Sequence, residues 1–270
     1  LPDGKTLQIA STHYLGQNFA KGFNIKFKDK DNNELHAYQT CYGPGIWRIM
    51  AAIISVHGDN RGLVIPPSVA PVDVVIIPIV KSGANNELII KKCKDVKKKL
   101  EKNGYKVTLD ERDKTPGYKY ADWELKGVPF RIEIGEKEAN GEFVTFVARD
   151  ERVRKNVEIK EISKAIDKES EEMTKRLRDK SISKLEGKIK NAETVQEIKS
   201  ILDNDKAYAR ANICSIDADG KECGDIIQYE TKGGKVRGTL VGKKEEPFGN
   251  KKCVVCGKHA KHVVYIARQY

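Results

Sequence analysis

Long apolar runs are missing from this sequence, and aromatic residues are few. No uninterrupted apolar stretch approaches the roughly 20 residues that a membrane-spanning helix needs, so we expect no membrane partner. Aromatic residues make up 7% of the sequence and charged residues 33%. These proportions are ordinary for a protein whose lysine-rich surface carries many ion pairs. A chain of 270 residues is long enough for two or three domains.

Cysteines are also few, and their spacing is uneven. The sequence has six, and the last two form a C-x-x-C pair. Three disulfides in a secreted protein would fit the number. The spacing and the terminal pair instead favour a cytoplasmic protein with a metal site. The sequence begins at Leu1, within what reads as a domain, so we expect it to be the C-terminal portion of a longer protein.

Positive charge, by contrast, is in excess. Fifty Lys and Arg residues stand against 39 Asp and Glu residues, which gives a formal net charge of +11. A basic protein of this size is expected to bind polyanions, and nucleic acid is the first candidate. A solvated, lysine-rich surface without such a partner is the alternative.

The stretch from Tyr38 to Pro71 organises the chain. Gly43-Pro44-Gly45 leads into a helix predicted from Ile46, and Gly58 is placed to end it as a left-handed cap. One face of this helix is expected to be buried, with Ile49, Ala52, Ile53 and Val56. A guanidinium offers a stacking surface and phosphate donors, so Arg48 is suited to grip a nucleotide. A glycine hairpin before a core helix, with Arg48 in solvent, explains these residues equally well.

Upstream of this stretch, alternating runs predict strands at residues 6–10, 20–27 and 35–41. A loop is expected over residues 11–18 and a hairpin turn over residues 29–33. Gln8, Ser11 and His13 point to one side of this region. A neutral imidazole and a hydroxyl suit a small zwitterion or a ribose, although a solvated histidine is the commoner case.

The middle of the chain predicts a second, α/β region after the prolines at positions 66, 67 and 71. A nearly continuous apolar run over residues 72–80 is typical of a strand buried on both faces. Helices are predicted over residues 87–103 and 118–125, and strands over residues 106–109, 130–134 and 142–149. Because strand, helix and strand alternate at first, the sheet is expected to be partly parallel.

The last third combines a charged helix with a cysteine cluster. A charged connector is expected over residues 151–156, a long helix over 162–189, a turn at 191–194 and a short helix over 195–202. The C-x-x-C pair is a knuckle that presents two thiolates to a tetrahedral ion, and two earlier cysteines complete a four-thiolate site. The predicted ligands are Cys214, Cys223, Cys253 and Cys256. Replacement of one cysteine by His259 or His262, or a set of free thiols, are the alternatives.

Several of these stretches together resemble the prolyl-tRNA synthetases, which are class II aminoacyl-tRNA synthetases. Gly-x-Gly-x-x-Arg before an apolar helix is similar to motif 3 of that class. HGDNRGLVIPPSVAP and STHYLGQNF are similar to the prolyl versions of two neighbouring elements. D-x-R-x-x-x-P-G-Y-K, from Asp110, is similar to the anticodon-binding domain shared with the threonyl, histidyl and glycyl enzymes. The cysteine cluster resembles the C-terminal domain of the archaeal and eukaryotic type.

The resemblance implies a multidomain α/β and α+β fold. Residues 1–67 would form the C-terminal part of the antiparallel class II catalytic sheet. Residues 68–157 would form an α/β anticodon-binding domain with a mixed five-stranded sheet. Residues 158–270 would form an α+β, zinc-containing C-terminal domain.

The resemblance also implies activities, partners and site residues. The reaction is the ATP-dependent activation of proline, with Mg²⁺ sharing the phosphate charge, followed by transfer to tRNA(Pro). ATP contacts fall to Gln8, Ser11 and Arg48, proline contacts to His13, Gly43 and Gly45, and the catalytic roles to Arg48 and His13. Anticodon contacts fall to Tyr120, Glu124 and Arg131. Unpaired bases need stacking surfaces, acceptors and cations, and Arg149 is predicted as a further cation. Zn²⁺ is structural, and the final Tyr270 is expected to fold back toward the active site.

Three alternatives stay open at this point. Glu124 and Arg131 could form only a surface ion pair. The chain could belong to another synthetase of the subclass, such as the threonyl enzyme, or to a tRNA-binding module without catalysis. Motifs 1 and 2 of the class lie outside this sequence. We therefore expect a homodimer formed through the preceding part, and no proline activation by residues 1–270 alone.

Overall fold

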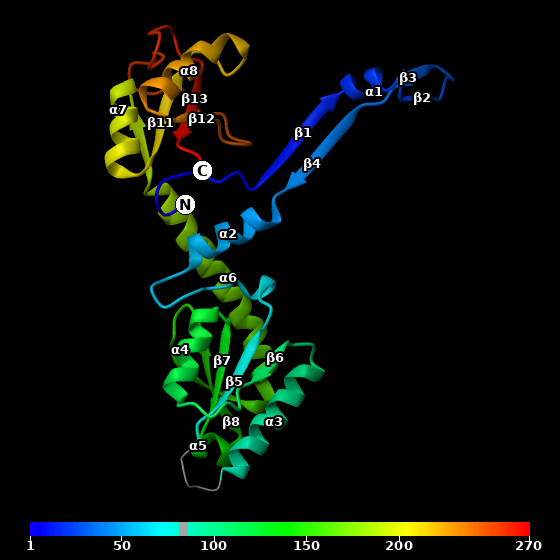
Figure 1. Ribbon diagram of the computed structural model, residues 1–270, viewed down its shortest axis with the longest axis vertical. Helices are drawn as coiled ribbons and strands as arrows, with labels where there is room; N and C mark the ends of the chain where they lie inside the picture. The colour runs from blue at the N-terminus through cyan, green and yellow to red at the C-terminus, as the bar shows by residue number, and fades with distance from the viewer. Residues whose placement is uncertain (81–85) are drawn as a thin grey trace. The chain divides into compact units, whose positions relative to one another are not determined.

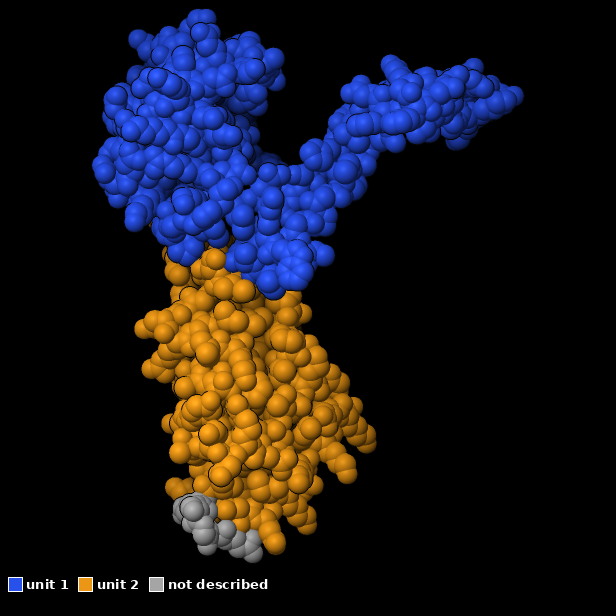
Figure 2. All heavy atoms as spheres, in the orientation of Figure 1, with its two compact units in different colours: residues 1–52, 188–270 blue, residues 53–187 orange. Residues whose placement is uncertain are grey.

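The structure is a computed structural model that describes residues 1–80 and 86–270 (Figure 1). Its contacts divide the chain into two compact units, which Figure 2 shows in different colours. We call Ile53–Gly187 the central unit. We call Leu1–Ala52 together with Lys188–Tyr270 the split unit. The three domain ranges expected from the sequence stay predictions.

The central unit is built around the expected mixed five-stranded sheet, in the order β6-β5-β7-β8-β9. β5 runs parallel to β6 and β7, and the other neighbours are antiparallel. Every residue of β5 is buried, as its continuous apolar sequence predicts. The strands are β5 (Val74–Pro78), β6 (Val107–Leu109), β7 (Phe130–Ile134), β8 (Phe143–Ala148) and β9 (Arg154–Glu158).

β9 corrects the expectation of a charged connector over residues 151–156. Its residues Arg154, Lys155 and Asn156 lie in an edge strand that pairs with β8. The sequence hides this strand because only Val157 is partly buried along it. An edge strand with one apolar contact lacks the alternation that identifies half-buried strands.

Helices cover the sheet of the central unit and share its core. They are α3 (Glu87–Lys102), α4 (Pro116–Lys126), α5 (Glu136–Asn140) and α6 (Ile162–Glu186). The first half of α6 buries Ile162, Ile166, Met173 and Leu177 in the same cluster as the strands. Farther along the helix, Ile182 and Leu185 are exposed. The helix ends at Glu186, three residues before the predicted end.

Helix α2 (Ile46–His57) begins at the predicted residue but is not buried as predicted. None of its residues is buried, and the predicted inner face is half-buried. Gly58 does not adopt a left-handed conformation. A Cβ at this position would lie 2.7 Å from the carbonyl oxygen of Ile54. Close backbone approach, and not a left-handed cap, therefore requires glycine here.

The split unit begins with a two-stranded antiparallel ladder of β1 (Ala10–Gly16) and β4 (Gln39–Pro44). β2 (Lys26–Lys28) and β3 (Glu34–His36) form the predicted hairpin. The predicted loop over residues 11–18 is wrong, because β1 occupies most of it and α1 (Asn18–Gly22) follows. The strands predicted over 6–10, 20–27 and 35–41 are shifted accordingly. β1 is largely exposed, so its polar side chains imitate a loop in the sequence.

The C-terminal part of the split unit is an α+β fold with a four-stranded sheet in the order β10-β11-β13-β12. β10 is parallel to β11, and the other pairs are antiparallel. The strands are β10 (Ile189–Ala192), β11 (Tyr208–Ile213), β12 (Lys235–Gly238) and β13 (His262–Ala267). The helices are α7 (Val195–Ser200), continued by a π-helical turn over Ile201–Asp205, and α8 (Lys221–Glu230). The predicted turn at 191–194 is wrong at its first two residues, which belong to β10.

Among residues 1–80 and 86–270, no helix combines the length and the apolar character that crossing a membrane requires.

Candidate functional site

The β1–β4 ladder places predicted site residues opposite one another. Ser11 pairs with Gly43, and His13 pairs with Cys41. Because side chains alternate along a strand, Ser11 and His13 lie on the same face of the ladder. His13 is exposed, and Ser11 is partly buried. The ladder therefore presents a hydroxyl and an imidazole side by side, opposite a glycine that leaves space.

Arg48 is tied to the residue predicted to share its ligand. Its Nη1 donates a hydrogen bond to the carbonyl oxygen of Gln8 at 3.2 Å, and Gln8 Nε2 donates to Ser11 Oγ. Gly45 N donates to the Ile9 carbonyl oxygen at 2.7 Å. A Cβ on Gly45 would lie 3.3 Å from that oxygen and 3.4 Å from Arg48 Cδ. The glycine thus permits the close approach that brings Gln8, Ser11 and Arg48 together.

A second group of predicted residues meets on α4 and β7. The Arg131 guanidinium lies 4.2 Å from the centre of the Tyr120 ring. Arg131 also donates to Glu124 Oε1 at 3.2 Å and to Glu133 Oε1 at 2.9 Å. The side chains of Glu124 and Arg131 are each 12% exposed. The ion pair foreseen as an alternative is therefore present, and a stacking ring lies directly beside it.

Arg149 is more buried than the other predicted residues and is fully engaged. Its two Nη atoms donate to both carboxylate oxygens of Asp59 at 3.0 and 2.8 Å, and its Nε donates to the Glu124 carbonyl oxygen at 3.1 Å. The hydrogen bond from Arg149 holds the pKa of Asp59 well below its usual value. Glu124, Arg131 and Arg149 line one small cavity. The Arg149 guanidinium forms part of the wall of this cavity, and it is held there by its hydrogen bonds to Asp59 and to the Glu124 carbonyl oxygen.

A network that the sequence reasoning missed lies at the start of α4. Arg112 donates to both oxygens of Asp110 at 2.9 and 2.7 Å, and Trp123 Nε1 donates to Asp110 at 2.7 Å. Burial would raise the pKa of Asp110, but these hydrogen bonds outweigh it and lower the pKa to about 2. Lys119 is buried and donates to the Asp110 carbonyl oxygen at 3.0 Å. The D-x-R spacing was the available signal for the Asp110–Arg112 pair.

The four predicted cysteines come together in the split unit. Their sulfur atoms all lie within 4.8 Å of one another. Cys223 Sγ is 3.8 Å from Cys214 Sγ and 3.9 Å from Cys253 Sγ. The Gly257 amide donates to the Cys253 carbonyl at 3.0 Å, which closes the knuckle. A backbone hydrogen bond at Lys258 lowers the pKa of Cys256 to about 7, whereas burial raises the pKa of Cys223.

The last residues pair with the first ones within the split unit. The Tyr270 hydroxyl donates to Asp3 Oδ2 at 2.5 Å, and the Tyr270 amide donates to the Thr6 carbonyl oxygen at 3.2 Å. The Lys5 ammonium lies 4.1 Å from the centre of the Tyr270 ring. The C-terminus is therefore bound to the segment that leads into β1. Its expected return toward the active site stays a prediction.

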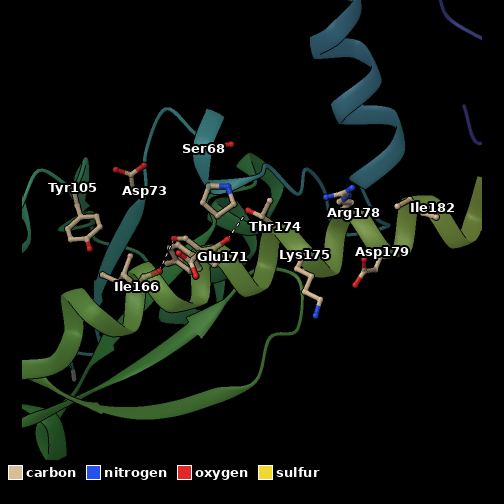
Figure 3. Close-up of a pocket in the computed structure, with 13 residues that line it drawn as sticks. Ser68, Asp73, Tyr105, Ile166, Glu171, Thr174, Lys175, Arg178, Asp179 and Ile182 are labelled. Carbon is tan, nitrogen blue, oxygen red and sulfur yellow. Dashed lines mark hydrogen bonds between the residues drawn. The ribbon is translucent and has the colours of Figure 1, made fainter. Parts of the chain in front are cut away.

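A larger cavity of about 850 Å³ lies along α6 in the central unit, and Figure 3 shows its lining. Its floor is apolar, and Lys175 and Arg178 contribute positive charge. The residues predicted from the sequence as site residues do not line it. The lining residues are Pro67, Ser68, Asp73, Tyr105, Phe130, Ile166, Ser170, Glu171, Thr174, Lys175, Arg178, Asp179 and Ile182.

Two protein-family models match this chain. Residues 73–169 match the model described as anticodon binding domain. Residues 195–270 match the model described as prolyl-tRNA synthetase, C-terminal. Together the matches cover most of the central unit and the C-terminal part of the split unit.

Curated relatives and solved structures match the whole chain. The chain is 42% identical to the proline–tRNA ligase of Thermofilum pendens and 38% identical to that of Ignicoccus hospitalis, over 100% of this chain and 55% of each relative. It resembles the crystal structure of Cryptosporidium parvum prolyl-tRNA synthetase complexed with halofuginone and AMPPNP. That match has a TM-score of 0.88 and 36% identity, over 100% of this chain and 55% of the other. The same enzyme with L-proline and AMP matches with a TM-score of 0.86 and 35% identity, over 99% and 56%.

The chain thus spans about half the length of the curated relatives that it matches. The sequence motifs, the mixed sheet of the central unit and the cysteine cluster agree with these comparisons. The chain as a whole is therefore homologous to the C-terminal part of the prolyl-tRNA synthetases.

Proposed function

We propose that this chain is the C-terminal part of a proline–tRNA ligase. In such an enzyme the proline carboxylate attacks the α-phosphate of ATP, which forms prolyl-adenylate and releases pyrophosphate. The prolyl group then passes to the terminal ribose of tRNA(Pro), and AMP is released. One observation carries the proposal: the 42% identity to a proline–tRNA ligase extends over the full chain, from the β1–β4 ladder to the cysteine cluster. The threonyl alternative has no comparable support.

For the nucleotide, we propose contacts from Gln8, Ser11 and Arg48. The Arg48 guanidinium would stack on the base, because its flat face is exposed and its other side is tethered to Gln8. ATP would bring Mg²⁺, which neutralises phosphate charge when it is bound. His13, Gly43 and Gly45 would hold proline. Both reaction steps then depend mainly on positioning and charge stabilisation.

For the anticodon, we propose that Tyr120 stacks on an unpaired base and that Glu124 accepts hydrogen bonds from a guanine edge. Arg131 and Arg149 would supply positive charge and hold Glu124 in place. The 12% exposure of Glu124 supports this role, because a carboxylate that is partly desolvated and oriented by cations binds donors selectively. The proline anticodon carries guanine at its second and third positions, so an oriented acceptor suits it.

For the cysteine cluster, we propose a structural Zn²⁺ site. Zinc–thiolate bonds of about 2.3 Å in a tetrahedron place the sulfur atoms about 3.8 Å apart. The shorter separations of 3.8 and 3.9 Å fit this geometry. Four thiolates leave no open position, so the ion would stabilise the fold and would not take part in the reaction.

The remaining assignments follow from the same proposal. We propose a cytoplasmic enzyme that forms a homodimer through the part of its relatives that this chain does not span. Without that part, residues 1–270 should bind RNA but should not catalyse proline-dependent pyrophosphate exchange. Full pyrophosphate-exchange activity of this chain alone would contradict the proposal that proline activation needs the part of the enzyme outside residues 1–270.

The anticodon assignment is tested by binding an anticodon stem-loop of tRNA(Pro) to the chain. Glu124→Gln should weaken binding about 5- to 150-fold, because a charged hydrogen bond to a base edge is worth about 1–3 kcal/mol. Glu142→Gln is the matched control, since the Glu142 side chain is 92% exposed and pairs with Lys92. Equal binding of a threonine-anticodon stem-loop would contradict the assignment.

The metal assignment is tested by elemental analysis of the purified chain. We expect one zinc per chain, and its loss in the Cys253→Ser variant. Cys41→Ser is the control, because Cys41 is exposed and lies outside the cluster. Zinc content that is the same in both variants would refute the site.

A further inference from the structure

A short turn after α2 connects two parts of the chain for which different roles are proposed. Helix α2 carries Arg48 in its first turn and ends at His57. Residues 59–63 follow and contact the C-terminal end of α4, where Glu124 lies. The contacts between the turn and α4 are all within the central unit.

The turn is rigid in itself. The Asp59 amide donates to the Gly62 carbonyl oxygen at 3.0 Å, and the Gly62 amide donates back to Asp59 at 3.2 Å. The Arg61 amide donates to Asp59 Oδ1 at 2.9 Å. These three hydrogen bonds fix the direction in which the Arg61 side chain leaves the backbone.

The turn is also tightly packed against α4. The Leu63 amide donates to the Leu125 carbonyl oxygen at 3.1 Å. Gly62 has a φ of +133°, and a Cβ there would lie 2.4 Å from Leu125 Cα. A Cβ on Gly127, the left-handed cap of α4, would lie 2.6 Å from Leu63 Cβ. Two glycines are therefore required where the turn meets the helix end.

Ion pairs also join the turn to α4 and the neighbouring strands, and these pairs differ in length and exposure. Asp59 is held by the buried Arg149 through two hydrogen bonds. Glu124 uses Oε1 for Arg131 at 3.2 Å and Oε2 for Arg61 at 3.5 Å. The Arg61 side chain is 58% exposed, whereas that of Arg131 is 12% exposed. The contact between Arg61 and Glu124 is the longest and most solvated of these, so it breaks first.

We infer that Arg61 is a positioning residue that links occupation of Glu124 to the turn and to the end of α2. The inference rests on the proposed role of Glu124 in binding guanine. A guanine edge presents two N–H donors, which together engage both carboxylate oxygens. Binding therefore displaces Arg61 from Oε2, while Arg131 remains because Glu133 also holds it. The turn then loses one of its ties to α4, and its amides open more easily.

The inference is tested by hydrogen exchange on the full chain, with and without an anticodon stem-loop that carries the proline anticodon. We expect saturating RNA to speed exchange at residues 59–62 by about two- to fivefold, as loss of an exposed ion pair allows. Arg61→Ala should show this faster exchange without RNA, and RNA should add nothing further. Arg61→Lys, which keeps the charge, should fall between the two.

Two controls separate this inference from a general charge effect. Lys160→Ala also removes one positive charge from an exposed ion pair, Lys160–Glu158, and should leave the response of the turn intact. A stem-loop with adenine in place of both anticodon guanines lacks the paired donors. At equal occupancy it should leave exchange at the turn unchanged.

The possible failures are distinguishable. Unchanged or slower hydrogen exchange at residues 59–62 with the bound proline stem-loop would contradict the inferred role of Arg61. It would not contradict the proposed anticodon site. An RNA response in Arg61→Ala equal to that of the unmodified chain would contradict that role in the same way. If the proline stem-loop does not bind, or Glu124→Gln binds it equally well, the proposed anticodon site fails and the inference fails with it.

Discussion

The sheet of the central unit and the β1–β4 ladder contain strands of similar length, but only the sheet has a core. Val74, Val75, Ile76 and Ile77 of β5 are at most 1% exposed. In the ladder no residue of either strand is buried, and Tyr14 and Tyr42 are 73% and 70% exposed. The strands are paired in both regions, with a bulge between Tyr14 and Gly16 in the ladder. The comparison shows that pairing fixes local geometry, whereas burial of both faces supplies most of the stability.

This difference bears directly on the proposed sites. The anticodon residues lie on a scaffold with its own core, so their geometry is set by packing within the central unit. The proposed ATP and proline residues lie on a ladder that is only two strands wide, and a two-stranded sheet is marginally stable alone. We therefore expect the anticodon site to be formed in this chain, and the other site to depend on further contacts.

The largest expected effect separates the two regions by one side-chain truncation in each. Ile76→Ala should lower the free energy of unfolding of the central unit by about 3–5 kcal/mol, because a fully buried side chain leaves a cavity. Tyr42→Ala should change it by less than about 0.5 kcal/mol, as expected of an exposed residue. Urea unfolding followed by tryptophan fluorescence measures both, since Trp123 is in the central unit and Trp47 is exposed.

A result in which Tyr42→Ala costs as much as Ile76→Ala would break the comparison. It would mean that the ladder unfolds cooperatively with the sheet. Hydrogen exchange of the unmodified chain provides an independent check. Amides of β5 should exchange only through global unfolding, and those of β1 should exchange much faster.

The second prediction compares one ion pair in each region. Asp59→Ala should destabilise the central unit by about 2–3 kcal/mol, because it leaves the buried Arg149 guanidinium without its carboxylate. Lys26→Ala removes an ion pair with Glu34 in the β2–β3 hairpin, where both side chains are exposed. It should have an effect below about 0.5 kcal/mol on the same unfolding curve. A similar loss of unfolding free energy in the two variants would show that burial does not determine how much these ion pairs contribute to stability.

The same difference explains how much the sequence could predict. β5, α3 and α4 were predicted within a few residues, because their apolar patterns match their burial. β1 was predicted as a loop, because a strand exposed on both faces shows no alternation. The periodic pattern of apolar residues reflects burial. Elements that pack against no core therefore lack the pattern and are hard to predict from the sequence.

The candidate sites follow a related rule. Cys253 and Cys256 were found from their spacing, since a C-x-x-C knuckle is a local geometry. Cys214 and Cys223 were added as the two cysteines that complete a four-thiolate set, and the structure brings all four together. The tie between Asp59 and Arg149 could not be found in this way, because the two residues are 90 positions apart. Long-range ion pairs depend on the fold that brings them together. The sequence gives their residue types and not their partners.

The third prediction uses pH to sharpen the contrast. Hydrogen bonds from Arg112 and Trp123 lower the pKa of Asp110 to about 2 in the folded chain, against an ordinary value of 3.8. A lowered pKa stabilises the fold above the ordinary value, and this stability is lost as the pH falls toward 2. Asp110→Asn should therefore cost about 1–2 kcal/mol at pH 6 and almost nothing near pH 2.

Asp29 of the β2–β3 hairpin is the control for this experiment. Its pKa is also lowered, by hydrogen bonds from Asn33, but it is only partly buried and lies outside the sheet. Asp29→Asn should leave the pH dependence of central-unit unfolding unchanged, because the hairpin does not unfold with the sheet. A pH-independent cost of Asp110→Asn would show instead that shape, and not charge, is the contribution of Asp110.

The prediction with the smallest effect tests whether the C-terminal sheet, which has a core of its own, unfolds independently of the central-unit sheet. Thr115 caps α4 by accepting from the Tyr118 amide at 3.3 Å, and Thr194 caps α7 by accepting from the Glu197 amide at 3.1 Å. Each Thr→Ala substitution should cost about 1 kcal/mol. Thr115→Ala should raise hydrogen exchange only in β5 and β7, and Thr194→Ala only in β10 and β11. If either variant raised hydrogen exchange in both sheets, the two cores would unfold in one cooperative transition. The difference would then lie between regions with a hydrophobic core and regions without one, and not between the two units.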